Sequence, residues 1–589
     1  MKYKLIAPVT YNNTCAQVLL NRGITQDNFN KYIYASLNDI HSPLDFGEDN
    51  MKEAVKMVTQ HVKNNDKTII IVDPDVDGNT SSALLLNYLY DLFPEWTKTI
   101  KIYFHDGKQH GLNDCVDYIL DNEYKFVLCP DGGSNDRFEC ATLQKYDIDV
   151  LILDHHDLDT KNPYAVIINN QEGYSNYPNK ALSGVGVVWQ FCRYIDSIMG
   201  TNHAMQYLDL VAIGNCADMM DIRSIETRAV IIEGLKQLRN PFIFYMAQKN
   251  AFKLGDKITP TGAAFYIVPL LNAIQRSGTL EEKQLVFKSM VKYYAFEKIP
   301  STKRGHQLGE METVVEQAVR TCTNVKNRQT RIQDAAVAAS EKQIEEYNLL
   351  DSCKVLILLL DEKSDVPAEV RGLIANKFMA KYQRPCCILT EHKEEDGEVS
   401  FAGSARGCSL AGVDDFKQLC LDSECIEYAV GHPNAFGLKI HKKDLQNFIN
   451  YMNDILKDMP NEPIYYVDYA FKGQQVDGNV ILDIANMESF WGTQLDEPYI
   501  AVEGLKVTPD MINIYKKKTN TIKISLNNGV SIMKFNADQE LCDKLTKNNT
   551  GYMEMDIVGK CNANNYMGTI TPQIFIEDYN IIDSSKYYF

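Results

Sequence analysis

A chain of 589 residues has room for three or four domains, and its 45% apolar composition is that of a globular protein rather than a disordered or fibrous one. The net charge of −18 argues against a protein that binds nucleic acid through bulk positive charge, although it does not exclude a local basic track. No apolar stretch approaches the roughly 20 residues that a membrane span needs, and the N-terminus does not resemble a signal peptide. We therefore expect a cytoplasmic protein in which the 15 scattered cysteines, which lack metal-ligand spacing, are mostly buried free thiols.

The first part of the chain predicts an α/β domain followed by helices. Residues 1–65 form a mixed segment with an expected helix at 50–63. From residue 66 to 238, apolar runs rich in β-branched residues alternate with helical patterns, which predicts βαβ units around a mostly parallel sheet. Residues 239–345 are mainly helical in pattern and are expected to connect two lobes.

The remaining residues predict a second α/β lobe and a β-rich C-terminal domain. Residues 346–460 form the second lobe, with expected strands at 355–360 and 386–390 and a helix at 369–382. Short strands separated by turns then run through residues 461–589. This pattern favours a small β-barrel, with an OB-fold as the leading candidate.

Four segments of the predicted α/β domain end an apolar run with Asp or His, at residues 69–80, 126–136, 150–159 and 210–221. Each resembles a buried parallel strand, and ligands bind at the carboxyl ends of such strands in open α/β sheets. Carboxylates that converge there repel one another unless cations neutralise them. The pattern therefore predicts a two-metal site of the kind used in phosphoryl chemistry.

In the first segment, Asp73, Asp75 and Asp77 alternate along an extended chain, so their side chains are expected on one side of it. Gly78 lets the backbone turn into a helix that is expected to begin near Thr80. Three acids on one face would be costly without a cation, and this cost favours metal binding over a purely structural role.

The other three segments add candidate ligands of unequal strength. Asp131 precedes two glycines and by itself could mark an everyday turn. His155 and His156 follow Asp154, and because neighbouring side chains point in different directions, one histidine can bind a metal while the other contacts substrate. Asp218 completes the set, although alone it could be a helix N-cap.

The four segments, in this order, resemble the motifs of the DHH phosphoesterase superfamily, whose third motif is Asp-His-His. Nearly the whole chain is similar to the RecJ-type single-strand-specific DNA exonucleases of that superfamily. The segments that carry this wider resemblance are 181–191, 268–276, 370–389, 403–407, 431–437 and 566–581. The resemblance implies an α/β fold with two lobes, a parallel-sheet DHH domain and a DHH-associated domain joined by helices, followed by a C-terminal OB-fold β-barrel.

The same resemblance implies roles for individual residues. It implies two Mn²⁺ or Mg²⁺ ions bridged by Asp131, and oxygen and imidazole donors suit these metals. The implied metal ligands are Asp73, Asp75, Asp77, Asp131, His155 and Asp218. The implied catalytic residues are Asp75, Asp77, Asp131, His155, His156 and Asp218. The implied substrate-binding residues are His105, His156, Arg276, Ser404, Arg406, Gly431 and His432.

Three positions depart from the family pattern, and one of them is Val430, since the family's Gly-Gly-His is Val430-Gly431-His432 here. Ile71 stands where many relatives carry a His that can bind the first metal, so Asp73 is expected to take a larger share there. His105 stands where the family usually has an Arg that faces a phosphate, and a neutral His is a weaker anion contact. These departures bear on efficiency and metal preference rather than on the reaction class. The Asn-, Lys- and Tyr-rich composition suggests a phage or prophage origin.

The resemblance implies a metal-dependent exonuclease that digests single-stranded DNA from 5′ to 3′ and releases mononucleotides, in DNA recombination, repair or phage DNA metabolism. The residues themselves do not dictate this polarity. One alternative is a phosphodiesterase of short oligonucleotides or cyclic dinucleotides, although such small substrates need no OB-fold track. Another is a non-catalytic DHH scaffold of a replication complex, although all the implied ligands are present.

The expected partners are single-stranded DNA and a single-strand-binding protein or helicase. The protein is expected to be a monomer in the cytoplasm of a bacterium or a phage-infected host.

Overall fold

The computed structural model divides the chain into two compact units, which are described separately below. The structure describes residues 2–105, 107, 109–361, 366–395, 397–460, 462, 464–516, 519–546 and 551–586. The first unit comprises Ile24–Lys326 and Glu488–Asp496, and the second comprises Met1–Gly23, Asn327–Met487 and Glu497–Phe589. The finer division into five domains stays a prediction.

The core of the first unit is a five-stranded parallel sheet with the order β3-β2-β4-β5-β6. Its strands are β2 (Thr68–Val72), β3 (Ile100–Phe104), β4 (Phe126–Pro130), β5 (Asp149–Asp154) and β6 (Val166–Asn169). Because the strands all run in one direction, their carboxyl ends meet at one edge of the sheet. The predicted parallel sheet is confirmed, and β2, β4 and β5 lead into the first three acid-bearing segments.

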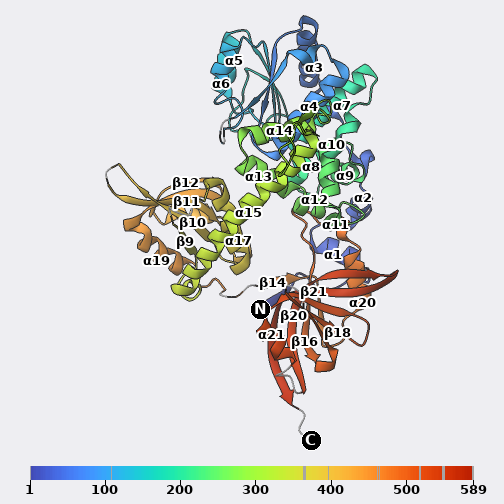
Figure 1. Ribbon diagram of the computed structural model, residues 1–589, viewed down its shortest axis with the longest axis vertical. Helices are drawn as coiled ribbons and strands as arrows, with labels where there is room; N and C mark the ends of the chain where they lie inside the picture. Colours follow the sequence, from blue (N-terminus) through green and yellow to red (C-terminus); the bar gives the residue numbers. More distant parts are fainter. Residues whose placement is uncertain are drawn as a thin grey trace. The chain divides into compact units, whose positions relative to one another are not determined.

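Helices cover both faces of this sheet (Figure 1). One face packs against α3 (Glu48–Asn64), α4 (Val76–Leu92) and α7 (Gly184–Met199), and the other against α5 (Val116–Asp121) and α6 (Arg137–Lys145). Successive side chains of a strand point to opposite faces, so Ile70 and Val72 pack with the first group while Ile69 and Ile71 pack with the second. Both faces of β2 are therefore apolar, and α3 confirms the helix expected at 50–63.

The sequence predicts a strand in the fourth acid-bearing segment, but the structure has a helix there. It forms α8 (Leu208–Ala217), which is buried along its length and packs against α4, α7 and α9 (Ile225–Lys236). The prediction was wrong because a short apolar run that is buried on all sides shows no periodicity that separates helix from strand. Asp218 consequently lies at the carboxyl end of a helix.

The rest of the first unit is mainly helical, as the pattern of residues 239–345 predicts. Its further helices are α2 (Phe29–Ile33), α10 (Pro241–Lys249), α11 (Ala251–Leu254), α12 (Pro260–Tyr266), α13 (Val268–Ser277) and α14 (Leu280–Met290). A short hairpin of β7 (Lys298–Pro300) and β8 (Met311–Thr313) interrupts them, which the sequence pattern did not indicate. The long helix α15 (Val314–Glu346) then continues into the second unit.

The second unit contains a five-stranded sheet with the order β12-β13-β11-β10-β9, in which β9 and β10 are parallel and the other pairs antiparallel. The strands are β9 (Leu356–Leu360), β10 (Cys386–Lys393), β11 (Val399–Arg406), β12 (Ile426–His432) and β13 (Ala435–His441). The helices around them are α16 (Leu349–Ser352), α17 (Ala368–Tyr382), α18 (Phe416–Asp422) and α19 (Leu445–Ile455). Since α17 packs on one face and α18 and α19 on the other, the predicted second α/β lobe is confirmed.

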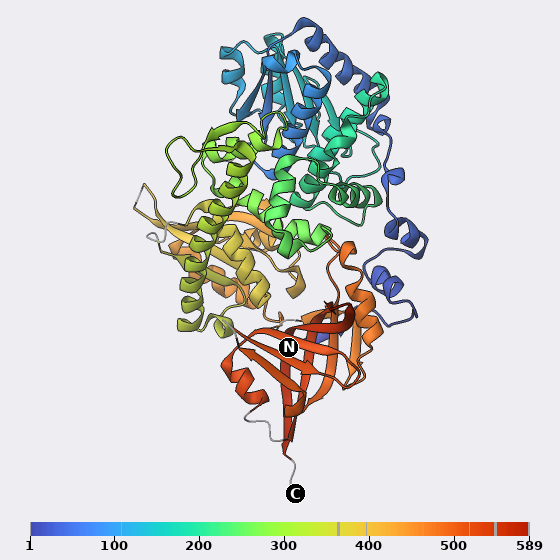
Figure 2. The same cartoon turned by 45° about the vertical axis from the view of Figure 1, so that its right-hand side comes forward.

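A seven-stranded sheet with the order β15-β16-β20-β21-β19-β18-β17 makes up the C-terminal part of the second unit (Figure 2). Its strands are β15 (Tyr469–Lys472), β16 (Tyr499–Val507), β17 (Ile512–Lys516), β18 (Asn520–Ser525), β19 (Ser531–Ala537), β20 (Gly551–Tyr566) and β21 (Thr569–Lys586). The helices of this part are α20 (Gly478–Ala485) and α21 (Gln539–Leu545). The N-terminal strand β1 (Lys2–Leu5), which precedes α1 (Thr14–Asn21), pairs in parallel with β14 (Ile464–Val467).

The state of the cysteines and the apolarity of the helices can be compared with what the sequence predicts. All 15 cysteines carry free thiols, and most of them are buried, as their scattered spacing predicts. Among the residues that the structure describes, none of the helices is both long and apolar enough to cross a bilayer.

Candidate metal centre

The first acid-bearing segment turns from strand to helix sooner than its sequence predicts. Helix α4 begins at Val76 rather than near Thr80, so the three acids do not alternate along an extended chain. Asp73 is buried just beyond β2, Asp75 is the N-cap whose carboxylate accepts a hydrogen bond from the Gly78 amide at 2.9 Å, and Asp77 lies in the first helical turn. A Cβ at position 78 would collide with Asp73, so glycine is required for this tight turn.

The Asp77 carboxylate is held by the start of α7. It accepts hydrogen bonds from the Ser183 hydroxyl at 3.1 Å and from the backbone amides of Gly184 at 2.7 Å and Val185 at 3.2 Å. The amide groups at a helix N-terminus favour an anion, so α7 fixes the orientation of Asp77.

Asp131 directly follows β4 in a backbone conformation that few residues adopt. Its φ angle is 68°, and its amide donates to the Leu153 carbonyl at 2.8 Å. The side chain is buried, and its Oδ1 atom accepts no hydrogen bond within the described part of the chain. A Cβ at position 184 would collide with this carboxylate, so Gly184 allows the close approach of α7. An orphaned buried carboxylate oxygen is costly unless a cation binds it.

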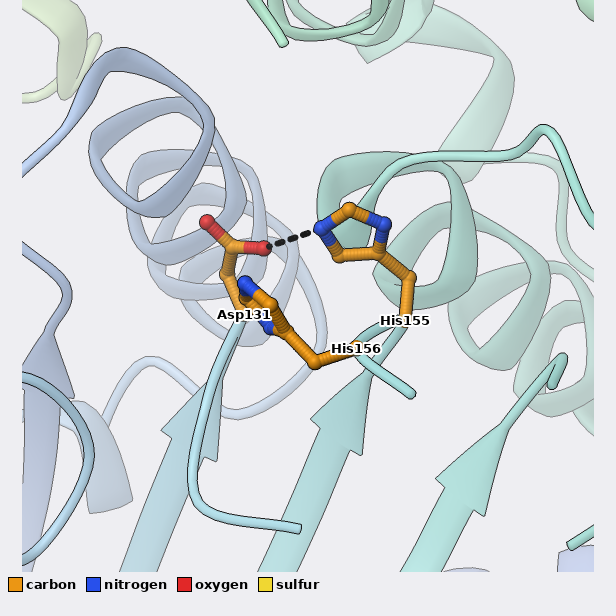
Figure 3. Close-up of side chains that lie close together, drawn as sticks. All are labelled: Asp131, His155 and His156. Atoms are coloured by element: carbon orange, nitrogen blue, oxygen red, sulfur yellow. Dashed lines mark ion pairs between the residues drawn. The ribbon is translucent and has the colours of Figure 1, made fainter. Parts of the chain in front are cut away.

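His155 directs one ring nitrogen at three carboxylates. Its Nε2 atom lies 3.3 Å from Asp131 Oδ1, 3.5 Å from Asp218 Oδ2 and 3.9 Å from Asp77 Oδ2. Figure 3 shows the imidazole of His155 pointing at Asp131 across the carboxyl ends of the strands. Burial lowers the pKa of His155, which favours the neutral imidazole that binds metals.

His156 is held by Asp154, to which the sequence assigned no separate role. His156 Nδ1 lies 2.7 Å from Asp154 Oδ1, and this oxygen also accepts from the backbone amides of both histidines. The hydrogen bond raises the pKa of His156 to about 9, although burial opposes the shift. Burial would raise the pKa of Asp154, but the hydrogen bond from His156 outweighs it and holds that pKa below its ordinary value. About half of the His156 side chain stays exposed, so a cationic ring is presented to solvent.

Asp218 is the C-cap of α8 rather than the end of a strand or an N-cap. The carboxyl end of a helix carries partial negative charge, so a carboxylate there is unfavourable without a counter-cation. Burial, together with the negative charges of Asp77 and Asp75, raises the pKa of Asp218 to about 8.

The electrostatics of the whole cluster favour a cation. Burial and the neighbouring acids also raise the pKa of Asp75 to about 6 and hold the pKa of Asp131 well above its ordinary value. Among the residues that the structure describes, no lysine or arginine forms an ion pair with the clustered carboxylates. The groups whose donor atoms lie within 4.8 Å of one another are Asp73–Asp75–Asp131, Asp77–His155–Asp218 and Asp131–His155–His156. This oxygen and imidazole set fits Mn²⁺ or Mg²⁺.

His105 directly follows β3, and its expected contact with a phosphate stays a prediction. Its side chain is buried, and its Nδ1 atom lies 2.6 Å from Asp114. A second histidine of the same loop, His110, is more than half exposed and places Nδ1 3.0 Å from an oxygen of Asp73. Sequence reasoning did not single out His110, because the loop between β3 and α5 carries no periodic pattern.

Arg276 lies near the end of α13, within the electrostatic reach of Asp75. Burial lowers the pKa of Arg276, and the negative charge of Asp75 opposes that shift. The prediction that Arg276 binds substrate is compatible with this position, because a guanidinium beside an acidic cluster can contact a phosphate there.

The implied substrate-binding residues of the second unit share one face of its sheet. In the strand register Arg406 pairs with Ala435, and Ala435 pairs with His432. Ser404 lies two residues before Arg406, so its side chain points to the same face. A Cβ at position 372 would collide with the Arg406 guanidinium, which therefore packs over α17. Gly431, with φ 134°, precedes His432 at the end of the edge strand β12.

Two family models match the chain. The model described as "DHH family, N-terminal domain" matches residues 67–215, and the model described as "RecJ OB domain" matches residues 467–578. The first match covers the parallel sheet with α4, α7 and most of α8, and the second covers most of the seven-stranded sheet.

A full-length relative decides the family. The putative SPbeta prophage-derived single-strand DNA-specific exonuclease YorK of Bacillus subtilis (strain 168) is 33% identical over 589 residues, which cover 100% of this chain and 99% of YorK. The chain belongs to the RecJ family of DHH phosphoesterases. The RecJ of the same bacterium, named a single-stranded-DNA-specific exonuclease, is 24% identical over 96% of this chain and 67% of its own length.

Solved RecJ structures share the fold. The crystal structure of RecJ from Thermus thermophilus in complex with Mn²⁺ matches with a TM-score of 0.68 at 16% identity, over 97% of this chain and 76% of that one. The same RecJ in complex with Mg²⁺ matches with a TM-score of 0.61 at 15% identity, over 98% and 75%. The predicted α/β fold with two lobes and a C-terminal OB domain is thereby confirmed.

The structure gathers most of the residues implied by the RecJ resemblance. At the carboxyl edge of the first sheet it brings together Asp73, Asp75, Asp77, Asp131, His155, His156 and Asp218. Ser404, Arg406, Gly431 and His432 lie together in the second unit. The functional roles of these residues within the RecJ-family protein stay predictions.

Proposed function

We propose that this protein is a metal-dependent exonuclease that hydrolyses single-stranded DNA from 5′ to 3′ and releases mononucleotides. The observation that supports this best is the buried cluster of carboxylates and His155, in which Asp131 Oδ1 has no hydrogen-bond donor within the described residues. A related protein over the full length of the chain is named a putative single-strand DNA-specific exonuclease. The polarity is carried over from the family rather than argued from the site.

Two divalent cations, Mn²⁺ or Mg²⁺, would be held by residues of this cluster. Asp77, His155 and Asp218 would hold one ion and Asp73 and Asp75 the other, and Asp131 would serve both, since it shares one close group with Asp73 and Asp75 and another with His155. Such ions, when bound, lower the pKa of a water and stabilise the negative charge that builds up on a phosphate. The fold fixes the orientation of two of these ligands before a cation binds. Helix α7 orients Asp77, and the turn at Gly78 sets the position of Asp73.

The two histidines of the third segment would have different roles. His155 is buried with a lowered pKa, so it offers a neutral nitrogen to a cation. His156 has a raised pKa and a half-exposed ring, so at neutral pH it would donate an N–H to a non-bridging phosphate oxygen. Asp154 keeps this ring in a fixed orientation through the 2.7 Å hydrogen bond to Nδ1.

Arg276 in the first unit and Arg406 in the second would bind nucleotide phosphates. The planar guanidinium donates in pairs to phosphate oxygens, which a lysine cannot match. Ser404 and His432 would add donors on the sheet face that carries Arg406, and Gly431 would let the backbone approach the strand. We further propose that the enzyme acts as a monomer in phage or bacterial DNA metabolism. A helicase or single-strand-binding protein would supply the single strand.

The direct test is digestion of a labelled oligonucleotide of about 30 nucleotides by the purified protein with Mn²⁺. A single strand labelled at its 5′ end should release labelled mononucleotide at once, whereas the same strand labelled at its 3′ end should shorten progressively. The matched duplex should be resistant, and EDTA should stop the reaction.

Other outcomes separate the alternatives. Early release of the 3′ label would contradict the polarity. Cleavage of dinucleotides but not of the 30-mer would replace the exonuclease with a phosphodiesterase of small substrates. A complete lack of hydrolysis with Mn²⁺, Mg²⁺ and other divalent metals would favour the non-catalytic scaffold.

A further inference from the structure

A histidine outside the four acid-bearing segments contacts the metal-binding cluster. His110 lies in the loop between β3 and α5, and its Nδ1 atom is 3.1 Å from Asp73 Oδ1 and 3.0 Å from Asp73 Oδ2. Because an ionised carboxylate has only acceptor atoms, Nδ1 carries the hydrogen and acts as the donor to it. Both the neutral ring with Nδ1–H and the imidazolium supply this donor, so the contact does not depend on the charge of His110.

The residues that follow His110, up to Asn113, are held in place by several contacts. The Leu112 amide donates to Asp136 Oδ2 at 2.6 Å, and the Asn113 side chain donates to the His110 carbonyl at 3.2 Å. Gly111 has φ 61°, and a Cβ there would collide with the Asp136 carboxylate. The position of His110 is therefore set by hydrogen bonds and close backbone packing and not by chance exposure of a side chain.

Asp73 has few other groups that could orient it. Ile71, on β2, is apolar and packs away from the cluster, and Asn79 donates to the Asp73 backbone carbonyl rather than to its carboxylate. Within the described part of the chain, His110 is the one side chain that donates a hydrogen bond to the Asp73 carboxylate. The other close neighbours of this carboxylate are Asp75 and Asp131, which repel it when ionised.

We propose that His110 is a positioning residue of the metal centre, which holds the Asp73 carboxylate in the orientation that a divalent cation requires. Carboxylates that bind metals are themselves hydrogen-bonded, and loss of such a partner typically lowers metal affinity about 10–100-fold. Nδ1 contacts both oxygens of Asp73 at nearly equal distances, so it restricts rotation of the whole carboxylate. This inference rests on the proposed function only in that the cluster binds a cation, and it does not depend on the substrate.

The test is a Mn²⁺ titration of the DNA-free protein by calorimetry, with three variants. His110→Ala should bind Mn²⁺ about 10–100-fold more weakly than the wild type. His110→Asn keeps an N–H donor close to the position of Nδ1, so it should recover most of the affinity. His306→Ala is the matched control, because His306 is another exposed histidine of the first unit and its ring lies against the Lys303 carbonyl rather than near the cluster. It should bind Mn²⁺ like the wild type.

A second measurement separates positioning of Asp73 from direct contact with DNA. The exonuclease rate of His110→Ala should return towards the wild-type rate at saturating Mn²⁺, with an unchanged KM for DNA. Unchanged Mn²⁺ affinity in His110→Ala, or a loss that His110→Asn does not reverse, would overturn the proposal. A raised KM for DNA with normal Mn²⁺ binding would assign His110 to the phosphate instead. Should the wild type bind Mn²⁺ but digest no DNA, the proposed function would fail while the role of His110 could still be measured.

Discussion

The carboxyl edge of the parallel sheet and the sheet face of the second unit that carries Arg406 differ in how their charged and polar side chains are arranged. At the first, buried and partly buried acids stand close together, several with raised pKa values, and none forms an ion pair with a lysine or arginine within the described residues. At the second, Arg406, Ser404 and His432 are at least partly exposed and are spread over adjacent strands. The acids of the first region favour a bound cation, whereas the residues of the second region are predicted to contact a phosphate with donors of their own.

This difference predicts the size of the effect when each region is altered. Loss of one buried ligand weakens the binding of the cation that neutralises the remaining acids, so the whole site is affected at once. Loss of one exposed donor leaves water to solvate the rest, so binding weakens in small steps. Four changes can break or sharpen this contrast.

Asp131→Asn should have the largest effect. The shape of the side chain is kept, but the oxygen that would contact both cations loses its charge, so turnover of single-stranded DNA should fall by about 10³-fold or more. The metal-free variant should melt at a higher temperature than the wild type, because a buried charge with a raised pKa has been removed. A variant with near-normal turnover would disprove the bridging role of Asp131.

Asp154→Asn should lower the rate about tenfold at pH 8 and much less at pH 6. Asp154 raises the pKa of His156 to about 9, so the wild-type ring is mainly a cation at pH 8. Without the carboxylate the pKa returns towards the ordinary value of about 6.5, and the ring is then neutral at pH 8 but still largely charged at pH 6. The pH–rate profile measures this, and an identical loss at both pH values would show that Asp154 acts only through the fold.

Arg406→Ala should weaken single-strand binding by about tenfold and reduce the salt slope by about one. Mn²⁺ affinity should not change, because Arg406 belongs to the other region of the molecule. Lys377→Ala is a matched control on α17, since this exposed cation pairs with Asp334 and lies away from the sheet face. Equal effects of both variants on the salt slope would show that Arg406 acts only through its positive charge and not through a specific phosphate contact.

Metal removal should produce the smallest effect, a change in melting temperature of several degrees that depends on pH. Folding raises the pKa of Asp75 to about 6 and of Asp218 to about 8, so the folded state holds these protons more tightly than the unfolded state. The contribution of these two groups to the stability of the metal-free protein is therefore fully present below the ordinary carboxyl pKa of about 4 and is lost as the pH rises through 6 and 8.

Mn²⁺ replaces those protons, so the increase in melting temperature on adding Mn²⁺ should be larger at pH 8 than at pH 5. Asp218→Asn should flatten this pH dependence, because the group with the pKa of about 8 is gone. A pH-independent melting curve of the metal-free wild type would contradict the electrostatic description of the cluster.

The elements that carry the first three acid-bearing segments could be predicted because their sequence patterns are local. A run such as Ile69–Ile70–Ile71–Val72 is apolar on both faces, which is typical of a strand covered by helices on both sides. Asp73, Asp131 and His155 follow such runs directly, so the parallel sheet brings them to one edge.

The features that were missed depend on contacts between distant residues. The apolar run before Asp218 is compatible with a strand or a buried helix, and only its packing among α4, α7 and α9 decides for a helix. The positions of His105 and His110 follow from the pairing of His105 with Asp114 and of Leu112 with Asp136. Neither pairing has a sequence pattern, so the loop could not be oriented from the residues alone.

The most direct test of the metal centre is anomalous scattering from crystals of the protein soaked in Mn²⁺. We expect two peaks about 3.5–4 Å apart at the carboxyl edge of the parallel sheet, on either side of the Asp131 carboxylate. Soaked crystals without a peak at this edge, or with Mn²⁺ bound only elsewhere, would contradict the assignment of the cluster as the catalytic metal centre.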